Sequence, residues 1–178
     1  MKVAFITLGC KVNHYESQAM EELFLQDGWE VTDLSGNPDA VVINTCTVTA
    51  TGDAKSRQMI AKAHRLSPDA LIAVTGCYAQ LSEERVRQLP GVRLVIGTGG
   101  KTDIVRKVKE AFEYGEPVVS VSDIRTEKWF EPMSAVRDSR TRATLKIQDG
   151  CENFCSYCAI PYARGRFEAG RFRKWRKN

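Results

Sequence analysis

Short apolar runs alternate with helix-like segments through the first two thirds of the sequence, and this alternation constrains the fold most. Most runs are nearly continuous in Val, Ile, Leu and Ala, which is typical of strands buried on both faces of a parallel sheet. Strands are predicted at 3–8, 29–34, 40–44, 70–75 and 92–96. Helices are predicted at about 14–27, 53–65, 82–89 and 102–114. The pattern predicts an α/β domain whose mostly parallel five-stranded sheet is flanked by helices, in a flavodoxin-like or Rossmann-like order.

One connection is unusually short for a parallel sheet. The link from about Leu34 to Ala40 has less chain than a usual parallel crossover needs. The strand at 29–34 is therefore predicted to be a short edge strand with only a turn of helix behind it.

The last third of the chain has a different pattern. Residues 116–142 contain few periodic apolar positions and several turn residues. We interpret 1–121 as an N-terminal α/β domain and 122–142 as a linker with some local strand character. A new strand at 144–147 is predicted to open a second domain over 143–178.

Three cysteines follow that strand closely, with the spacing C-x3-C-x2-C at Cys151, Cys155 and Cys158. Structural zinc takes four ligands, but no Cys or His follows Cys158. An iron–sulfur cluster is usually held by four thiolates, so three would leave one iron open to the amine and carboxylate of a substrate or cofactor. The alternatives are a chance cluster and a disulfide knot.

Three further cysteines, Cys10, Cys46 and Cys77, each come within two residues of the end of a predicted strand. The carboxyl ends of parallel strands share one edge of the sheet, where ligands bind in open α/β folds. If these strands are neighbours, their spacing of roughly 4.8 Å brings the three loops within reach of one cluster. The alternatives are ordinary buried cysteines and a catalytic thiol at Cys10, which precedes a predicted helix.

The composition indicates the cellular compartment of the chain and the charge of its partners. No window approaches 18 apolar residues, and the first residues look like a strand rather than a signal peptide. We therefore expect a cytoplasmic chain, in which six cysteines are more readily metal ligands or reactive thiols than disulfides. Residues 1–121 carry 13 Lys and Arg against 15 Asp and Glu, whereas 122–178 carry 13 against 7. The basic part suggests a polyanionic partner such as RNA, and a solvated tail is the alternative.

The C-x3-C-x2-C motif, with aromatic Tyr157 before its third cysteine, resembles the radical S-adenosylmethionine (SAM) superfamily. With both sets of thiols in view, the chain resembles the radical-SAM methylthiotransferases to about Arg166. The matching segments are Thr7–Ser17, Asn44–Val48, Val74–Gln80 and Gly150–Arg166. Within that family, Gly-Cys-Lys-Val-Asn at 9–13 looks like the branch that acts on threonylcarbamoyladenosine beside the tRNA anticodon. The isopentenyladenosine branch tends to read Gly-Cys-Gln-Met-Asn, and the ribosomal-protein branch Gly-Cys-Pro-Lys-Asn.

The resemblance implies a transferase that inserts sulfur into a C–H bond of the modified adenine and methylates it. It implies two [4Fe-4S] clusters and SAM as cofactors. The cluster on Cys151, Cys155 and Cys158 would cleave SAM to a 5′-deoxyadenosyl radical. The auxiliary cluster on Cys10, Cys46 and Cys77 would carry the sulfur, and a second SAM the methyl group. Tyr157 would lie near the SAM adenine, with simple packing as the alternative. tRNA, an electron donor and a sulfur source are the implied partners.

Two features depart from the family pattern or stay unassigned. The chain ends about one strand into the expected radical-SAM βα barrel, so an incomplete barrel, and little or no activity from this chain alone, are expected. Its last residues, 167–178, read as an atypical basic tail, which we interpret as a truncated or frame-shifted end rather than an RNA-binding device. Asn13 and Glu16 have no assigned role, and helix capping and surface charge are the simplest explanations for them. The ribosomal-protein branch, and a non-enzymatic iron–sulfur or zinc-binding module, are the alternative functions.

Overall fold

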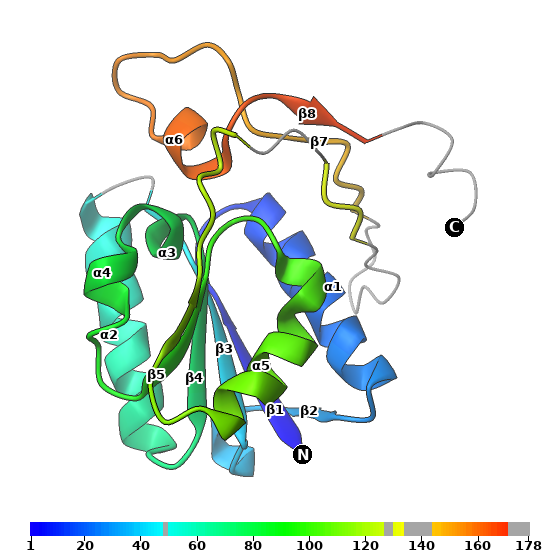
Figure 1. The fold of residues 1–178 in the computed structure, drawn as a ribbon, viewed down its shortest axis with the longest axis vertical. Coiled ribbons are helices and arrows are strands. Elements are labelled where there is room, and N and C mark those ends of the chain that lie inside the picture. Colours follow the sequence, from blue (N-terminus) through cyan, green and yellow to red (C-terminus); the bar gives the residue numbers. More distant parts are fainter. Residues whose placement is uncertain (48–49, 127–129, 134–143, 171–178) are drawn as a thin grey trace.

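The computed structural model describes residues 1–47, 50–126, 130–133 and 144–170. Figure 1 shows two parts, a layered α/β body and a second segment that passes over one end of it. The second segment is defined here as residues 144–170. The body contains the sheet that positions the first set of cysteines.

The body is built on one parallel sheet in the order β2-β1-β3-β4-β5-β6. Its strands are β1 (Lys2–Thr7), β2 (Glu30–Thr32), β3 (Ala40–Thr45), β4 (Leu71–Gly76), β5 (Val92–Ile96) and β6 (Val118–Ser120). The central strands β3 and β4 are buried at every residue, as a parallel sheet covered on both faces requires. The first five strands follow the flavodoxin-like order 2-1-3-4-5.

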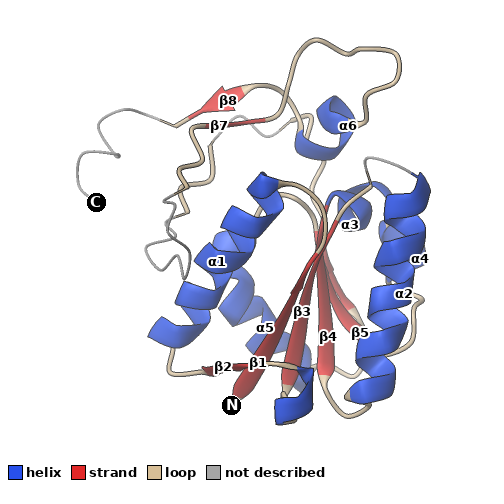
Figure 2. Cartoon of the chain, turned by 180° about the vertical axis from the view of Figure 1, so that it is seen from behind, coloured by secondary structure: helices blue, strands red, loops and turns tan. Residues whose placement is uncertain are grey.

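Helices cover both faces of this sheet, as Figures 1 and 2 show from opposite sides. The helices α1 (Lys11–Gln26) and α5 (Ile104–Glu113) lie on one face. The other face carries α2 (Ala50–Leu66), α3 (Cys77–Leu81) and α4 (Glu83–Val86). Single turns of 3-10 helix occur at η1 (Leu34–Gly36) and η2 (Lys101–Asp103).

Two apolar cores result, one on each face. Alternate residues of a strand point to opposite faces, so Val42 packs with Phe24 and Val108 while its neighbour Ile43 packs with Ile60 and Tyr78. Both cores contain fully buried side chains. Burial of these apolar faces is the main force that holds the helices on the sheet.

The predicted α/β class and parallel sheet are confirmed, with six strands instead of five. The additional strand β6 lies in 116–121, where no strand was predicted, because three half-exposed residues are too few to show a periodic pattern. The short edge strand and the single turn after it are confirmed as β2 and η1. Helices α1 and α2 begin about three residues earlier than predicted.

The second segment differs more from expectation. Residues 144–147 are not a strand; instead β7 (Gln148–Asp149) pairs antiparallel with β8 (Glu168–Ala169), and α6 (Ile160–Arg164) lies between them. Much of the predicted linker 122–142 and most of the basic tail lie outside the described residues. A barrel is not seen in the described part of the second segment.

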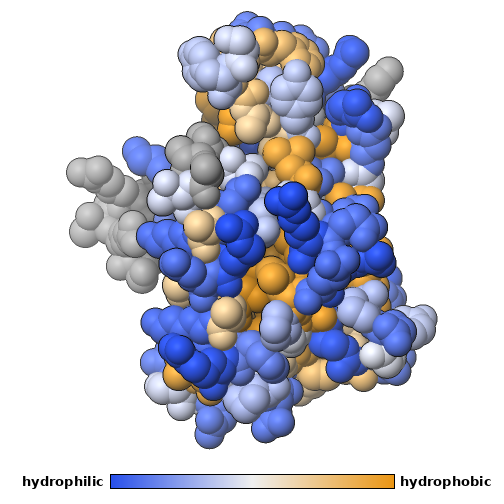
Figure 3. Space-filling view, turned by 90° about the vertical axis from the view of Figure 1, so that its left-hand side faces the viewer, coloured by the Kyte–Doolittle hydropathy of each residue, from blue (hydrophilic) through white to orange (hydrophobic). Residues whose placement is uncertain are grey.

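Figure 3 shows hydrophilic residues around a smaller hydrophobic area on the side where α2 and α4 lie. Among the described residues, no helix is both long enough and apolar enough to span a membrane.

Candidate functional site: two sets of thiols joined by a buried ion cluster

Cys10, Cys46 and Cys77 lie at one edge of the sheet, which we call the thiol edge. Their strands β1, β3 and β4 are direct neighbours, so the condition set by the sequence is met. Thr45 of β3 pairs with Gly76 of β4, and the next residues along the chain are Cys46 and Cys77. Cys10 is the N-cap residue of α1. The parallel register thus places three distant cysteines at the carboxyl ends of adjacent strands.

Two glycines leave room at this edge. Gly9 has a φ of +106°, and a Cβ there would lie 2.9 Å from the Sγ of Cys46. Gly76 has a φ of +97°, and its Cβ would lie 2.4 Å from the carbonyl oxygen of Thr45. Both positions therefore need a residue without a side chain. The missing side chain at Gly9 allows Cys46 to approach the turn that carries Cys10.

Asn13 ties the loops of the thiol edge together. Its side-chain amide donates to the carbonyl oxygens of Leu8 at 2.8 Å and Thr45 at 2.9 Å. Its Oδ1 accepts from the thiol of Cys10 at 3.6 Å. Asn13 is fully buried. Asn13, which had no assigned role, therefore does not simply cap the helix, because its side chain bridges two strand-end loops.

The thiols themselves differ in exposure. Cys10 is exposed, Cys46 is intermediate and Cys77 is buried, and all six cysteines of the chain are free. Burial raises the pKa of the Cys77 thiol, while the charges of Arg164 and Lys101 act against this increase. The thiol donors, with Cys46 packed against the turn that carries Cys10, fit a metal cluster held by three thiolates. However, no three Cys, His, Asp or Glu side chains of the described residues are grouped as a metal-binding set.

Cys151, Cys155 and Cys158 lie on the loop between β7 and α6. The amide of Cys158 donates to the carbonyl of Cys155 at 2.9 Å, which folds the loop into a turn. Tyr157, inside that turn, is 90% exposed, so its ring does not pack within the described part of the chain. The amide of Cys151 donates to the carbonyl of Gly165 at 3.1 Å. The first cysteine of this set is thus attached to the residue that follows α6.

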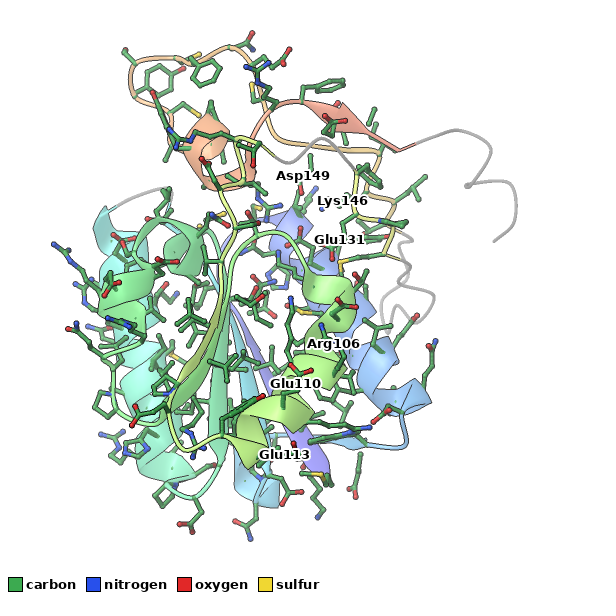
Figure 4. All side chains as sticks on the ribbon, in the orientation of Figure 1. Arg106, Glu110, Glu113, Glu131, Lys146 and Asp149 are labelled. Carbon is green, nitrogen blue, oxygen red and sulfur yellow. The ribbon has the colours of Figure 1, made fainter. Side chains whose placement is uncertain are left out.

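A buried ion cluster connects the second segment to the body. It consists of Glu16, Lys101, Lys146, Asp149 and Arg164. Glu16 is fully buried and pairs with Lys101, with Lys146 at 2.8 Å and with Arg164 at 2.9 Å. Glu16, which had no assigned role, is therefore not a surface charge. In Figure 4, Lys146 and Asp149 lie together where the second segment passes over α1.

The charges of the cluster stabilise one another. Burial alone would raise the pKa of Glu16, but Lys101, Arg164 and Lys146 hold it well below its usual value. Burial would likewise raise the pKa of Asp149, and Arg164 and Lys146 lower it instead. Burial would lower the pKa of Arg164, but Glu16 and Asp149 raise it further above its usual value. Charges buried in this way require their partners.

A cavity of about 360 Å³ lies beside the ion cluster, between the ends of β5 and β6 and the second segment. Asp149 and Arg164 form part of its wall, together with Arg166 and Glu168. The cavity is therefore bounded by both parts of the chain.

Sequence reasoning missed the ion cluster. Arg164 lies inside the Gly150–Arg166 motif, but its role depends on partners more than 140 residues away. Lys101 follows two glycines at the start of a short helix and has no pattern that marks burial. The position of Glu16, on the apolar side of a helix that faces the sheet, was the available signal.

Together, the doubly wound parallel sheet and the cysteine-bearing strand ends define an α/β protein with a candidate metal-binding edge. The chain belongs to Uncharacterized protein family UPF0004, whose model matches residues 2–97. The strand ends that carry Cys10, Cys46 and Cys77 all lie within the matched residues.

Proteins named as tRNA-modifying enzymes align in sequence with nearly the whole chain. It is 49% identical over 164 residues to the threonylcarbamoyladenosine tRNA methylthiotransferase MtaB of Bacillus subtilis. It is 42% identical over 167 residues to the MtaB of Aquifex aeolicus. It is 33% identical over 174 residues to the tRNA-2-methylthio-N(6)-dimethylallyladenosine synthase of Fusobacterium nucleatum. These alignments cover 92%, 93% and 93% of this chain, and 36%, 41% and 38% of the relatives. The resemblance to the methylthiotransferases, and to their threonylcarbamoyladenosine branch, is confirmed.

Proposed function

We propose that this chain carries the N-terminal part of a tRNA methylthiotransferase that acts on N6-threonylcarbamoyladenosine beside the anticodon. The observation that carries the proposal is the position of Cys10, Cys46 and Cys77 at the carboxyl ends of three adjacent strands of one sheet. The relatives named as threonylcarbamoyladenosine tRNA methylthiotransferases support the substrate branch over the ribosomal-protein alternative.

Each set of three cysteines is proposed to hold one [4Fe-4S] cluster, since three thiolates leave one iron open. When bound, the clusters and SAM supply hydrogen abstraction, sulfur and the methyl group. The residues of this chain hold and orient these groups. Asn13 fixes the loops before Cys10 and Cys46, and the Gly165 carbonyl fixes the backbone of Cys151. Tyr157, whose ring is exposed, is proposed to contact the SAM adenine.

The proposed partners are tRNA, an electron donor and a sulfur source, in the cytoplasm. The excess of Lys and Arg in 122–178 supports a polyanionic partner. The domain division at 121 and 143 is proposed to separate the cluster-bearing body from the start of a radical-SAM barrel. The chain spans about 36–41% of the length of these MtaB relatives, so the activity of the whole enzyme is proposed to need more than this chain.

Iron and sulfide content after anaerobic reconstitution tests the proposal. The measurement compares this chain with a variant in which Cys151, Cys155 and Cys158 are all changed to Ala. Retention of about half the iron supports two independent three-cysteine sites, as cluster ligation by thiolates requires. Loss of all iron from the variant would mean that Cys10, Cys46 and Cys77 hold no cluster.

A second candidate is a non-enzymatic iron–sulfur or zinc-binding module, whose ligands would come from the six free cysteines. Metal identity separates the candidates, because zinc binds without visible colour whereas iron–sulfur clusters absorb visible light. Zinc bound at full occupancy in place of iron after reconstitution with both metals would favour the module.

A further inference from the structure

We propose that Arg164 is a positioning residue that holds the two sets of thiols in a fixed relation, through Asn13 on one side and Asp149 on the other. The inference rests on the proposed function only for the identity of what the thiols bind. The contacts that carry it are made by side chains and backbone of this chain.

On the side of the thiol edge, Arg164 contacts the residue that organises the loops. Its Nη2 donates to Oδ1 of Asn13 at 2.7 Å. The same oxygen accepts from the thiol of Cys10, and the amide of Asn13 binds the carbonyls before Cys10 and Cys46. The charge of Arg164 also acts on the thiol of Cys77. Through Asn13, one guanidinium is therefore connected to the loops that carry Cys10 and Cys46.

On the side of the second segment, Arg164 contacts the chain that leads into the other set of thiols. Its Nη1 donates to both carboxylate oxygens of Asp149, at 3.0 and 2.9 Å. Asp149 ends β7, two residues before Cys151. The residue after Arg164, Gly165, accepts the amide hydrogen of Cys151. The chain at Cys151 is thus held in two ways: by the ion pair between Arg164 and Asp149, and by the backbone hydrogen bond from Cys151 to Gly165.

Glu16 fixes the guanidinium between these two sides. Arg164 donates to both oxygens of Glu16, at 2.9 and 3.2 Å, and Glu16 is fully buried on α1. A guanidinium presents several donors in one plane, so it can serve Asn13, Glu16 and Asp149 at once. A lysine is a single flexible point charge and cannot span the same acceptors. The planar arrangement of donors in the guanidinium, and not its charge alone, therefore allows Arg164 to link the thiol edge to the second segment.

The ion cluster also carries more positive than negative charge. Among the described residues, Lys101, Lys146 and Arg164 pair with two carboxylates, those of Glu16 and Asp149. Lys107 and Glu131, which line the cavity together with Asp149 and Arg164, add one charge of each sign. The excess positive charge next to Cys77 suits an occupant with negative charge, such as metal-bound thiolates.

Backbone hydrogen exchange of the reduced, metal-free chain tests the connection. In Arg164→Lys, we expect amides in peptides 10–14 and 147–151 to exchange at least about tenfold faster, because a buried pair has lost its geometry. The matched control is Arg106→Lys, whose exposed arginine pairs with Asp103 and Glu110. Faster exchange in 147–151 alone, or in neither peptide, would overturn the proposal.

Two further variants separate positioning from loss of the fold. Asp149→Asn acts on the second segment, and Asn13→Ser acts on the thiol edge. Each is expected to increase exchange in the peptide on the opposite side of Arg164, with amides of β3 and β4 unchanged. These two variants test the connection even if Arg164→Lys unfolds. If each substitution speeds exchange only in the peptide that contains it, Arg164 does not connect the two sets of thiols.

A spectroscopic readout addresses the thiol edge directly. After reconstitution of the variant with Cys151, Cys155 and Cys158 changed to Ala, Arg164→Lys is expected to alter the paramagnetic resonance spectrum of the reduced cluster. An unchanged spectrum would contradict positioning of the first set. If no cluster forms in either protein, the proposed function fails, while the exchange result still decides the role of Arg164.

Discussion

Arg164 and Glu16 form a two-point ion pair across 148 residues of sequence, with Nη1 to Oε1 at 2.9 Å and Nη2 to Oε2 at 3.2 Å. The pair joins α6 to the first helix of the body, and both side chains are buried. It places the second segment at the carboxyl ends of the strands that carry the first three cysteines. In Figure 4, Lys146 and Asp149 of the ion cluster lie apart from Arg106, Glu110 and Glu113, which lie along α5.

Removing the carboxylate of Glu16 is expected to destabilise the chain strongly. Glu16→Gln leaves Lys101, Lys146 and Arg164 buried without their shared partner, which typically costs about 3–5 kcal/mol. Denaturant unfolding followed by circular dichroism measures this change. Glu110→Gln is the matched control, because Glu110 is exposed and its pair with Arg106 should contribute under about 1 kcal/mol. Equal effects of the two substitutions would contradict the importance of the cluster.

Acid is expected to weaken the attachment of the second segment. The pKa values of Glu16 and Asp149 are lowered in the folded chain. A carboxylate with a lowered pKa contributes stability above its unfolded value, about 4 for these residues, and loses it as pH falls through the folded value. The unfolding midpoint should therefore decrease progressively below about pH 4. Glu16→Gln should show a shallower dependence on pH over the same range, and an identical slope would argue against Glu16 as a source.

A side chain at Gly9 is expected to disturb the first set of thiols. Gly9→Ala would place a Cβ 2.7 Å from the Cβ of Cys46, in a backbone conformation that disfavours alanine. When Gly9→Ala is added to the variant that lacks Cys151, Cys155 and Cys158, the protein should bind clearly less iron than that variant alone. Gly28→Ala is the control, because Gly28 also has a positive φ but nothing lies within 4 Å of its Cβ position. If both variants bind the same iron, the space beside Cys46 is not needed.

Tyr157 is expected to have no part in stability. Its ring is 90% exposed, so Tyr157→Ala should change the free energy of unfolding by less than about 0.5 kcal/mol. Phe154→Ala, which removes a ring packed edge-on against Tyr162 with centroids 5.9 Å apart, should cost more. Thermal unfolding of the two variants provides the comparison. A substantial loss in Tyr157→Ala would mean that the ring packs against the chain in solution.

Local sequence patterns were sufficient for most of the body. The runs at 40–44 and 70–75 are buried on both faces, and that chemistry is visible without tertiary contacts. The strand β6 could not be predicted, since three residues with partial exposure show no period. In the second segment, β7 and β8 have two residues each. The paired residues Asp149 and Glu168 are 19 positions apart, so neither strand has a local sequence pattern that predicts it.

By itself, the sequence determined the α/β class, the position of three cysteines directly after strands, and the close spacing of Cys151, Cys155 and Cys158. These follow from periodicity and spacing, which are local properties of the chain. Only the tertiary structure decided that β1, β3 and β4 are neighbours and that Glu16 is buried. Strand order and ion pairing depend on contacts between distant residues, and a charged side chain in the sequence does not indicate whether its partner lies in solvent or in the core.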